Sequence, residues 1–295
     1  MAFTLVIQSK GLFNKAKSID FGALLNVCKL KYGSYNEFYT LDEGKTVGGT
    51  AVLYNPERIG RGIFIDASNV KQGEIKVGYN IPTTPAEIED FVKIVKEVER
   101  QFGKVSMHEE DDKKEYTTAS LEKEIKPMID FSLEKLNEGC SNNPNMPYIL
   151  TLSKFPWAID EEKREKYKTI KTLDDFEYTI HEKQKEDIYY AKPSLFKDGK
   201  SGKILAFYTL TSNCLSCFPV NPESFINKSV NKIDEAFIRF FIYEEEKVVD
   251  GFYPYSKFVD YLKQKGVKMF DAERMRVPEI SKDEIMAFVE SVKQE

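Results

Sequence analysis

Short apolar runs separated by turn-forming residues fill the first part of the chain. Runs of this length, rich in β-branched and aromatic residues, are typical of strands rather than helices. Parallel strands need long crossover connections, and most of these runs are only a few residues apart, so we expect an antiparallel meander or hairpins. The predicted strands cover residues 3–7, 38–41, 50–54, 63–66 and 74–79.

A helical period replaces this pattern after residue 83. Thr-Pro-Ala-Glu at 84–87 has the form of a capping box with proline at the first helical position. In that motif Thr84 accepts a hydrogen bond from the Glu87 amide, and the Glu87 carboxylate accepts one from the Thr84 amide. We expect a helix that ends at Gly103 and packs on one face of the sheet through an apolar stripe, formed by Ile88, Phe91, Val92, Val95, Val98 and Phe102.

The second half mixes both patterns. We expect strands at 148–152, 187–191, 203–210 and 236–243, the last with a hairpin partner at 247–252. The expected helices are one over 120–138, kinked or delayed by Pro127, one over 161–167, and three that begin at the caps Thr172, Ser256 and Ser281.

A run of charged residues at 109–115 interrupts the pattern and has no periodic apolar position with which to bury a face. Residues 139–147, rich in asparagine and proline, are an alternative boundary. We predict an α+β protein with mostly antiparallel sheets, amphipathic helices packed on one face, and two subdomains of similar size. The predicted parts are an N-terminal α+β domain (1–108), a charged linker (109–119) and a C-terminal α+β domain (120–295).

Composition narrows the class of protein. The chain has 295 residues, of which 41% are hydrophobic and 31% charged, so it can bury a core. A formal net charge of -5 argues against nucleic acid as a partner, because such binding rests on neutralising phosphates. The chain has no basic leader followed by a long apolar run and no bilayer-length apolar segment, so we expect a soluble cytoplasmic protein that does not bind membranes.

Cys214 and Cys217 are the only pair with a spacing typical of zinc or dithiol chemistry. A second ligand pair at ribbon spacing is missing, and the residues after Cys217 continue as a predicted loop. The favoured interpretation is two small buried side chains. We therefore predict no metal and no cofactor, and keep a metal- or thiol-dependent enzyme that uses this pair as the alternative function.

The histidines and paired acids specify no reaction. His108 and His181 are isolated, and a histidine-dependent hydrolase needs a nucleophile and an orienting acid close in space. Acidic pairs such as Asp174 and Asp175 suit a metal or acid–base catalysis, but with 48 carboxylates in the chain solvated surface is the expected reading. We predict no catalytic residues.

Two features suit binding. Arg58 and Arg61 flank a tight turn and offer planar donors for a carboxylate or phosphate. Tyr253 and Tyr255 precede a predicted helix, and tyrosines in exposed loops supply contact area at interfaces. The competing interpretation is that the arginines face water and the aromatic residues staple the helix.

The stretches 61–68 and 81–88 resemble the bacterial family catalogued as domain of unknown function 4299, over a region of mainly 50–103. The resemblance implies a small bacterial cytosolic protein with no established activity, and it supplies no catalytic residues. Because the residues show no catalytic constellation and the arginine and tyrosine features suit binding, we expect a non-enzymatic module that binds another protein or a small ligand. A toxin-neutralising immunity protein is a further alternative, and the oligomeric state is open.

Overall fold

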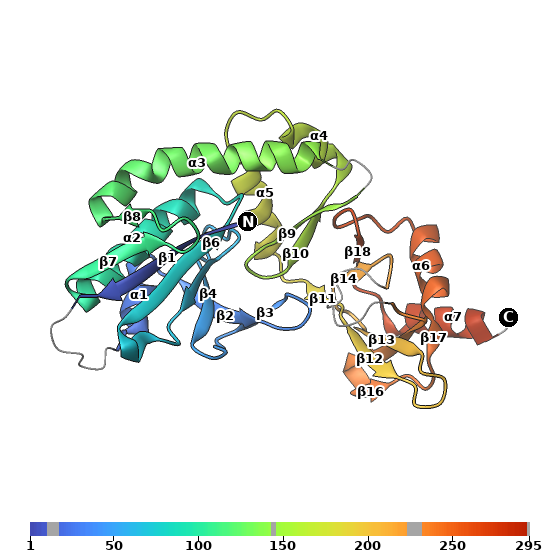
Figure 1. The fold of residues 1–295 in the computed structure, drawn as a ribbon. Helices are drawn as coiled ribbons and strands as arrows, with labels where there is room; N and C mark the ends of the chain where they lie inside the picture. Colours follow the sequence, from blue (N-terminus) through green and yellow to red (C-terminus); the bar gives the residue numbers. More distant parts are fainter. Residues whose placement is uncertain (11–17, 143–145, 223–231, 294–295) are drawn as a thin grey trace. The chain divides into compact units, whose positions relative to one another are not determined.

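The computed structural model describes residues 1–10, 18–142, 146–222 and 232–293 (Figure 1). The chain forms two compact units of different size. Unit 1 comprises Met1–Trp157 and Glu161–Glu186, and unit 2 comprises Ala158–Asp160 and Asp187–Glu295. The predicted α+β class is confirmed, whereas these units match neither the predicted borders nor the expectation of similar sizes.

Unit 1 is built on an eight-stranded sheet in the order β3-β2-β4-β5-β6-β1-β7-β8, in which each described strand pair is antiparallel. The strands are β1 (Ala2–Ser9), β2 (Lys31–Tyr35), β3 (Leu41–Glu43), β4 (Thr50–Tyr54), β5 (Ile63–Asp66), β6 (Glu74–Asn80), β7 (Val105–Glu109) and β8 (Glu115–Tyr116). The predicted antiparallel pairing is therefore confirmed, but only β4, β5 and β6 follow each other as in a meander, since β3 lies outside β2 and β1 lies between β6 and β7. A short 3-10 helix, η1 (Val70–Gln72), precedes β6.

The strand predicted at 38–41 is wrong. Residues 38–40 lie in the turn between β2 and β3, and Leu41 is the first residue of β3. In this turn the Asn36 side chain accepts hydrogen bonds from the backbone N–H groups of Phe38 (3.0 Å) and Thr40 (3.3 Å). A side chain that captures backbone donors in this way competes with a strand ladder. The apolar Phe38 is buried in this turn and does not mark a strand.

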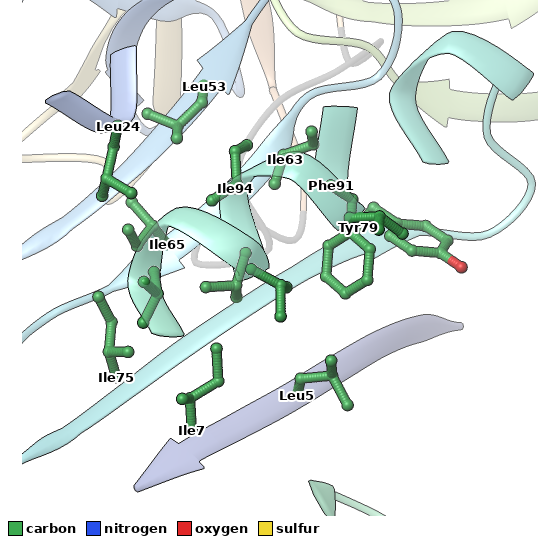
Figure 2. Packing of buried hydrophobic residues seen from close by; sticks show 14 of the residues in the cluster. Leu5, Ile7, Leu24, Leu53, Ile63, Ile65, Ile75, Tyr79, Phe91 and Ile94 are labelled. Carbon is green, nitrogen blue, oxygen red and sulfur yellow. The ribbon is translucent and has the colours of Figure 1, made fainter. Parts of the chain in front are cut away.

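Helices α1 (Phe21–Val27), α2 (Pro85–Phe102) and α3 (Thr118–Ser141) contribute to a single core with one face of this sheet. Figure 2 shows Phe91 and Ile94 of α2 beside Leu5, Ile7 and Ile65 of the strands. The apolar stripe predicted for α2 thus packs on the sheet as expected. Its N-cap is Thr84, whose side chain accepts from the Glu87 N–H at 3.2 Å, and Gly103 is its C-cap.

Helix α3 runs through Pro127 without a break, so the predicted delay is wrong, and it ends at Ser141 inside the alternative boundary. Its first turn is secured by Thr117 and Ser120, whose side chains each accept a hydrogen bond from the other's backbone N–H. Residues 143–145 of that boundary lie outside the described residues.

The charged run at 109–115 is the hairpin that joins β7 to β8, not a linker between units. Lys113 adopts a left-handed backbone conformation (φ 61°), and Glu110 pairs with Lys76 of β6. Strand pairing on both sides keeps the segment inside unit 1, while its charges stay at the surface. A run with no apolar period therefore marks a turn here.

Unit 1 is completed by β9 (Tyr148–Thr151), α4 (Glu161–Tyr167) and α5 (Asp174–Lys185), while β10 (Pro156–Ile159) pairs with β9 and lies where the chain passes between the units. The predicted helix over 161–167 is confirmed. The N-cap of α5 is Leu173, one residue after the predicted cap, and the Thr172 hydroxyl donates instead to the Asp174 carboxylate at 2.9 Å.

Unit 2 holds a sheet in the order β12-β13-β15-β16, with β17 also paired to β15, and a three-stranded sheet β11-β14-β18. Within them β13 pairs with β15 and β11 with β14 in parallel. The strands are β11 (Tyr189–Tyr190), β12 (Pro193–Lys197), β13 (Ile204–Thr211), β14 (Ser216–Pro219), β15 (Glu235–Ile242), β16 (Lys247–Val248), β17 (Tyr253–Pro254) and β18 (Arg274–Val277).

Helices α6 (Tyr255–Gln264) and α7 (Lys282–Lys293) pack on unit 2's core, and η2 (Tyr243–Glu245) is a short 3-10 helix. The capping box at Ser281 is present: the Ser281 N–H donates to Glu284 at 3.1 Å, and the Glu284 N–H donates to the Ser281 hydroxyl at 3.3 Å. The cap predicted at Ser256 is wrong, because α6 begins at Tyr255 with Pro254 as its N-cap.

Candidate functional site

The segment between β4 and β5 carries both arginines singled out by sequence. It begins as an Asx turn, in which the Asn55 side chain accepts from the Glu57 N–H at 2.9 Å. The Ile59 N–H then donates to Nδ1 of His181 on α5 at 3.0 Å. The Gly60 carbonyl accepts from Gln184 Nε2 at 2.7 Å. These contacts hold the turn against α5.

The Glu87 carboxylate lies at the centre of this region and is buried. It accepts hydrogen bonds from the N–H groups of Arg61 (2.7 Å) and Gly62 and from the Thr83 hydroxyl. A side chain at Gly60 would overlap this carboxylate, so only glycine allows the approach. Burial raises the pKa of Glu87, and the hydrogen bonds from Thr83 and from the two backbone groups oppose the rise.

One half of the predicted capping box is therefore wrong. Glu87 does not turn back to the Thr84 amide; it binds the neighbouring turn at Arg61 and Gly62 instead. The local motif predicted the start of the helix correctly, because Thr84 caps α2. The Glu87 carboxylate instead forms a tertiary contact with Arg61 and Gly62, which lie 26 and 25 positions away in the sequence.

Arg61 does not face water. Only 6% of the residue is exposed, and its guanidinium donates from Nε to the Thr151 carbonyl (2.9 Å) and from Nη1 to the Pro82 carbonyl (2.7 Å). Burial lowers the pKa of this group, and the nearby Tyr148 and Glu87 oppose that change. Arg61 thus ties β9 to the segment before α2.

Arg58, only three positions away, stays exposed. Its guanidinium lies 3.5 Å from Asp90, and 44% of its side chain is accessible. It borders a cleft of about 450 Å³ formed by the turn, the first turn of α2 and helix α5. The residues that line this cleft, which we call the α2–α5 cleft, are Glu57, Arg58, Pro85, Ala86, Glu89, Asp174, Glu177, Tyr178 and His181.

Donors and acceptors face each other in the α2–α5 cleft. Because Nδ1 of His181 accepts from a backbone N–H, its neutral ring carries the proton on Nε2, which is left as a donor. The Glu177 carboxylate accepts a long hydrogen bond (3.4 Å) from the Ala86 N–H at the start of α2. Burial raises the pKa of Glu177. Tyr178 is 64% exposed and offers a hydroxyl and a ring face.

The lining contains no serine, threonine or cysteine, the usual nucleophiles of covalent catalysis. Among the residues that the structure describes, no group of three or more His, Cys, Asp and Glu side chains is arranged to hold a metal ion. What the cleft provides is a set of hydrogen-bonding groups and formal charges around a cavity of ligand size.

The tyrosines expected in an exposed loop lie in the core of unit 2, which corrects that expectation. Tyr253 and Tyr255 are each 4% exposed. Their hydroxyls donate to the carbonyls of Asp250 (2.7 Å) and Pro219. Burial removes the exposure on which an interface role rested. The aromatic neighbour that does reach the surface is Phe252, which is 53% exposed.

All four cysteines are thiols. Cys217 is fully buried in β14, which continues through Phe218 and Pro219 where the sequence predicted a loop, and Cys214 is partly exposed. Burial raises the pKa of Cys28 to about 12 and that of Cys140 to about 11, which disfavours their reactive thiolate forms.

The sequence analysis thus identified Arg58 but not most of the other residues that line the cleft. His181 and Asp174 were noted only as isolated or surface residues, and Glu89, Glu177 and Tyr178 were not considered. The spacing of Asp174, Glu177, Tyr178 and His181 along one helix was the available signal, since positions three and four apart share a helix face.

The fold and the cleft define an α+β protein with a polar, ligand-sized cavity. The chain belongs to the family described as Domain of unknown function (DUF4299), whose model matches residues 2–288. No curated protein and no solved structure matches it. None of the helices that the structure describes is long and apolar enough to cross a membrane.

Proposed function

We propose that this protein is a non-enzymatic binding module and that the α2–α5 cleft holds a small ligand. The observation that carries the proposal is the convergence of three separate segments on one cavity of about 450 Å³. Pockets of roughly 300–1,000 Å³ are typical of small-molecule sites. Support also comes from the lining, which offers acceptors and donors for recognition.

The charge of the lining favours a ligand with a positively charged group. Four carboxylates, those of Glu57, Glu89, Asp174 and Glu177, face one guanidinium. That guanidinium, on Arg58, is already partly neutralised by Asp90. Opposite charge at close range stabilises a bound cation, and Tyr178 adds a ring face for cation–π contact.

A cytoplasmic location belongs to the same proposal. Support comes from the four cysteines, none of which is in a disulfide, because free thiols are typical of reducing compartments. The net charge of -5 supports a small cation as ligand in preference to nucleic acid.

Isothermal titration calorimetry with spermidine, 1,5-diaminopentane and 1,5-pentanediol tests the cleft. The amines should bind and the neutral diol should not. Glu177→Gln should weaken amine binding by about tenfold or more, equivalent to ~1.4 kcal/mol. Glu182→Gln is the matched control, because Glu182 lies on the same helix, pairs with Lys185 and does not line the cleft.

Equal weakening by Glu177→Gln and Glu182→Gln would assign the binding to general surface charge and refute the proposed site. Weakening should also follow from Tyr178→Ala, whose side chain is 64% exposed and can be removed at small cost in stability. Turnover of any of the three probes, followed by mass spectrometry, would contradict a non-enzymatic role.

A further inference from the structure

A second hollow lies on the face of the unit 1 sheet that the helices do not cover. Strand register places Val52 of β4 opposite Phe64 of β5, and Phe64 opposite Gly78 of β6. None of these three belongs to the helix-side core, whereas their sequence neighbours Ala51 and Ile65 do. Since successive residues of a strand point to opposite faces, Val52 and Phe64 lie on the outer face.

Two glycines let side chains pack closely on this face. A side chain at Gly78 would overlap the Phe64 ring, so this glycine lets the ring lie against β6. Gly62 has φ +88°, and a Cβ there would lie 2.5 Å from Val52 Cγ1. Beside these packed side chains lies a pocket of about 360 Å³, which we call the outer-face pocket, lined by Ser34, Tyr35, Val47, Thr50, Ala51, Val52, Arg61, Gly62, Phe64 and Asn80.

Arg61 is the charged residue of this lining, and no carboxylate accompanies it there. A guanidinium has five N–H donors. One from Nε and one from Nη1 reach the Thr151 and Pro82 carbonyls. The Glu87 oxygens accept from backbone N–H groups and from Thr83, not from the guanidinium. The guanidinium therefore keeps donors that these contacts do not use.

The other polar groups of the lining are neutral. The Tyr35 hydroxyl is committed to the Leu152 carbonyl at 2.7 Å, and the Thr50 hydroxyl donates to the Val47 carbonyl at 2.6 Å. Asn80 and Ser34 add an amide and a hydroxyl beside the apolar floor of Val52 and Phe64. One cation, few polar groups and an apolar floor suit a singly charged anion better than a phosphate, which brings more charge than one guanidinium offsets.

We propose that the outer-face pocket binds a small carboxylate with an apolar body, its carboxylate beside Arg61 and its hydrocarbon part on Val52 and Phe64. This site goes beyond the proposed function, because it shares no lining residue with the α2–α5 cleft. The two arginines that flank one turn thus serve two cavities with opposite preferences for ligand charge.

The test uses 3-phenylpropionate as the probe and 3-phenylpropanol as its neutral analogue, measured by calorimetry on the full chain. The acid should bind at least about tenfold more tightly than the alcohol, equivalent to ~1.4 kcal/mol. In ¹⁵N-resolved NMR spectra the acid should shift the backbone amides of Val52, Gly62 and Phe64. Equal binding of acid and alcohol, or no binding of the acid at millimolar concentration, would overturn the proposal.

Replacing Arg61 removes donors from two buried carbonyls, so a variant that leaves Arg61 in place is better suited. Val52→Phe fills the hollow. Val6→Phe is its matched control, because Val6 is a buried valine on β1, lies outside the helix-side core and does not line the pocket. Val52→Phe should weaken 3-phenylpropionate binding by tenfold or more, and Val6→Phe should leave it unchanged.

Thermal melting establishes that both variants fold. If Val52→Phe does not fold, the NMR shifts of the natural chain decide: shifts centred on Gly62 and Phe64 support the site, and shifts elsewhere refute it. Spermidine binding to the α2–α5 cleft should be the same in Val52→Phe and in the natural chain. Loss of one ligand with retention of the other therefore separates failure of this proposal from failure of the proposed function.

Discussion

Replacing Glu87 tests directly whether its buried carboxylate stabilises unit 1. Its removal leaves the buried N–H groups of Arg61 and Gly62 without their acceptor. An unsatisfied buried donor costs about 1–3 kcal/mol, so Glu87→Ala should lower the free energy of unfolding by ~2–6 kcal/mol. Glu87→Gln keeps one acceptor oxygen but places an amide N–H₂ against a donor, and should cost ~1–3 kcal/mol.

The pH dependence gives a sharper test. Burial raises the pKa of Glu87 in the folded state above its unfolded value of about 4.3. Protonation of Glu87 therefore stabilises the folded state. This contribution to the free energy of unfolding is fully present below the unfolded pKa and is lost as the pH rises through the folded pKa. Because Gln does not titrate, the difference in unfolding free energy between the natural chain and Glu87→Gln should be largest near the unfolded pKa and shrink towards neutral pH.

Urea unfolding followed by circular dichroism, repeated across this pH range, measures the difference. Glu89→Gln serves as control, because Glu89 lies on the same helix but is exposed, and its replacement should stay within about 0.5 kcal/mol. A difference that is constant with pH, or that grows towards neutral pH, would refute the assignment of a raised pKa to Glu87. A Glu87→Ala cost no larger than that of Glu89→Gln would refute the hydrogen-bond account.

Other expectations follow from burial elsewhere. Phe91→Ala in the core should lower the free energy of unfolding by ~3–5 kcal/mol in the same urea assay, and a cost below 1 kcal/mol would contradict the packing of α2 on the sheet. Tyr255→Phe should cost ~1–3 kcal/mol, because it leaves the buried Pro219 carbonyl without the donated hydroxyl. Cys28 and Cys140, whose pKa values are raised by burial, should react with Ellman's reagent at pH 8 much more slowly in the folded chain than in urea. Equal rates in the two conditions would refute that account of the thiols.

Local patterns predicted many elements well where one segment alone supplies the interaction. Thr84 caps α2 and Gly103 ends it, and Ser281 and Glu284 form their reciprocal cap on α7. These bonds join residues only a few positions apart, so a short stretch of sequence contains both partners. The strands β4, β5 and β6 were also predicted correctly, because each is a short apolar run bounded by turn residues.

The strands β12, β14 and β18 were not predicted. Each is short, and the register of β14 with β18 joins residues about sixty positions apart, as in the pairing of Ser216 with Val277. Strand propensity depends on the neighbours that a strand meets, so such a segment has little signal of its own. The prediction for the charged run at 109–115 was wrong for a different reason. Its composition was a clear signal, but a hairpin and a linker share that composition.

The sequence by itself determined the α+β class, the antiparallel start and the capped helices, since these rest on periodicity and on contacts within a few residues. Only the tertiary structure decided which of the two arginines beside one turn is buried and which is exposed. Arg61 turns inward because two carbonyls from distant segments accept its donors, and Arg58 stays outside and borders a cleft completed by α5. Contacts across 90 or 122 positions depend on how the elements pack, and no local pattern contains that information.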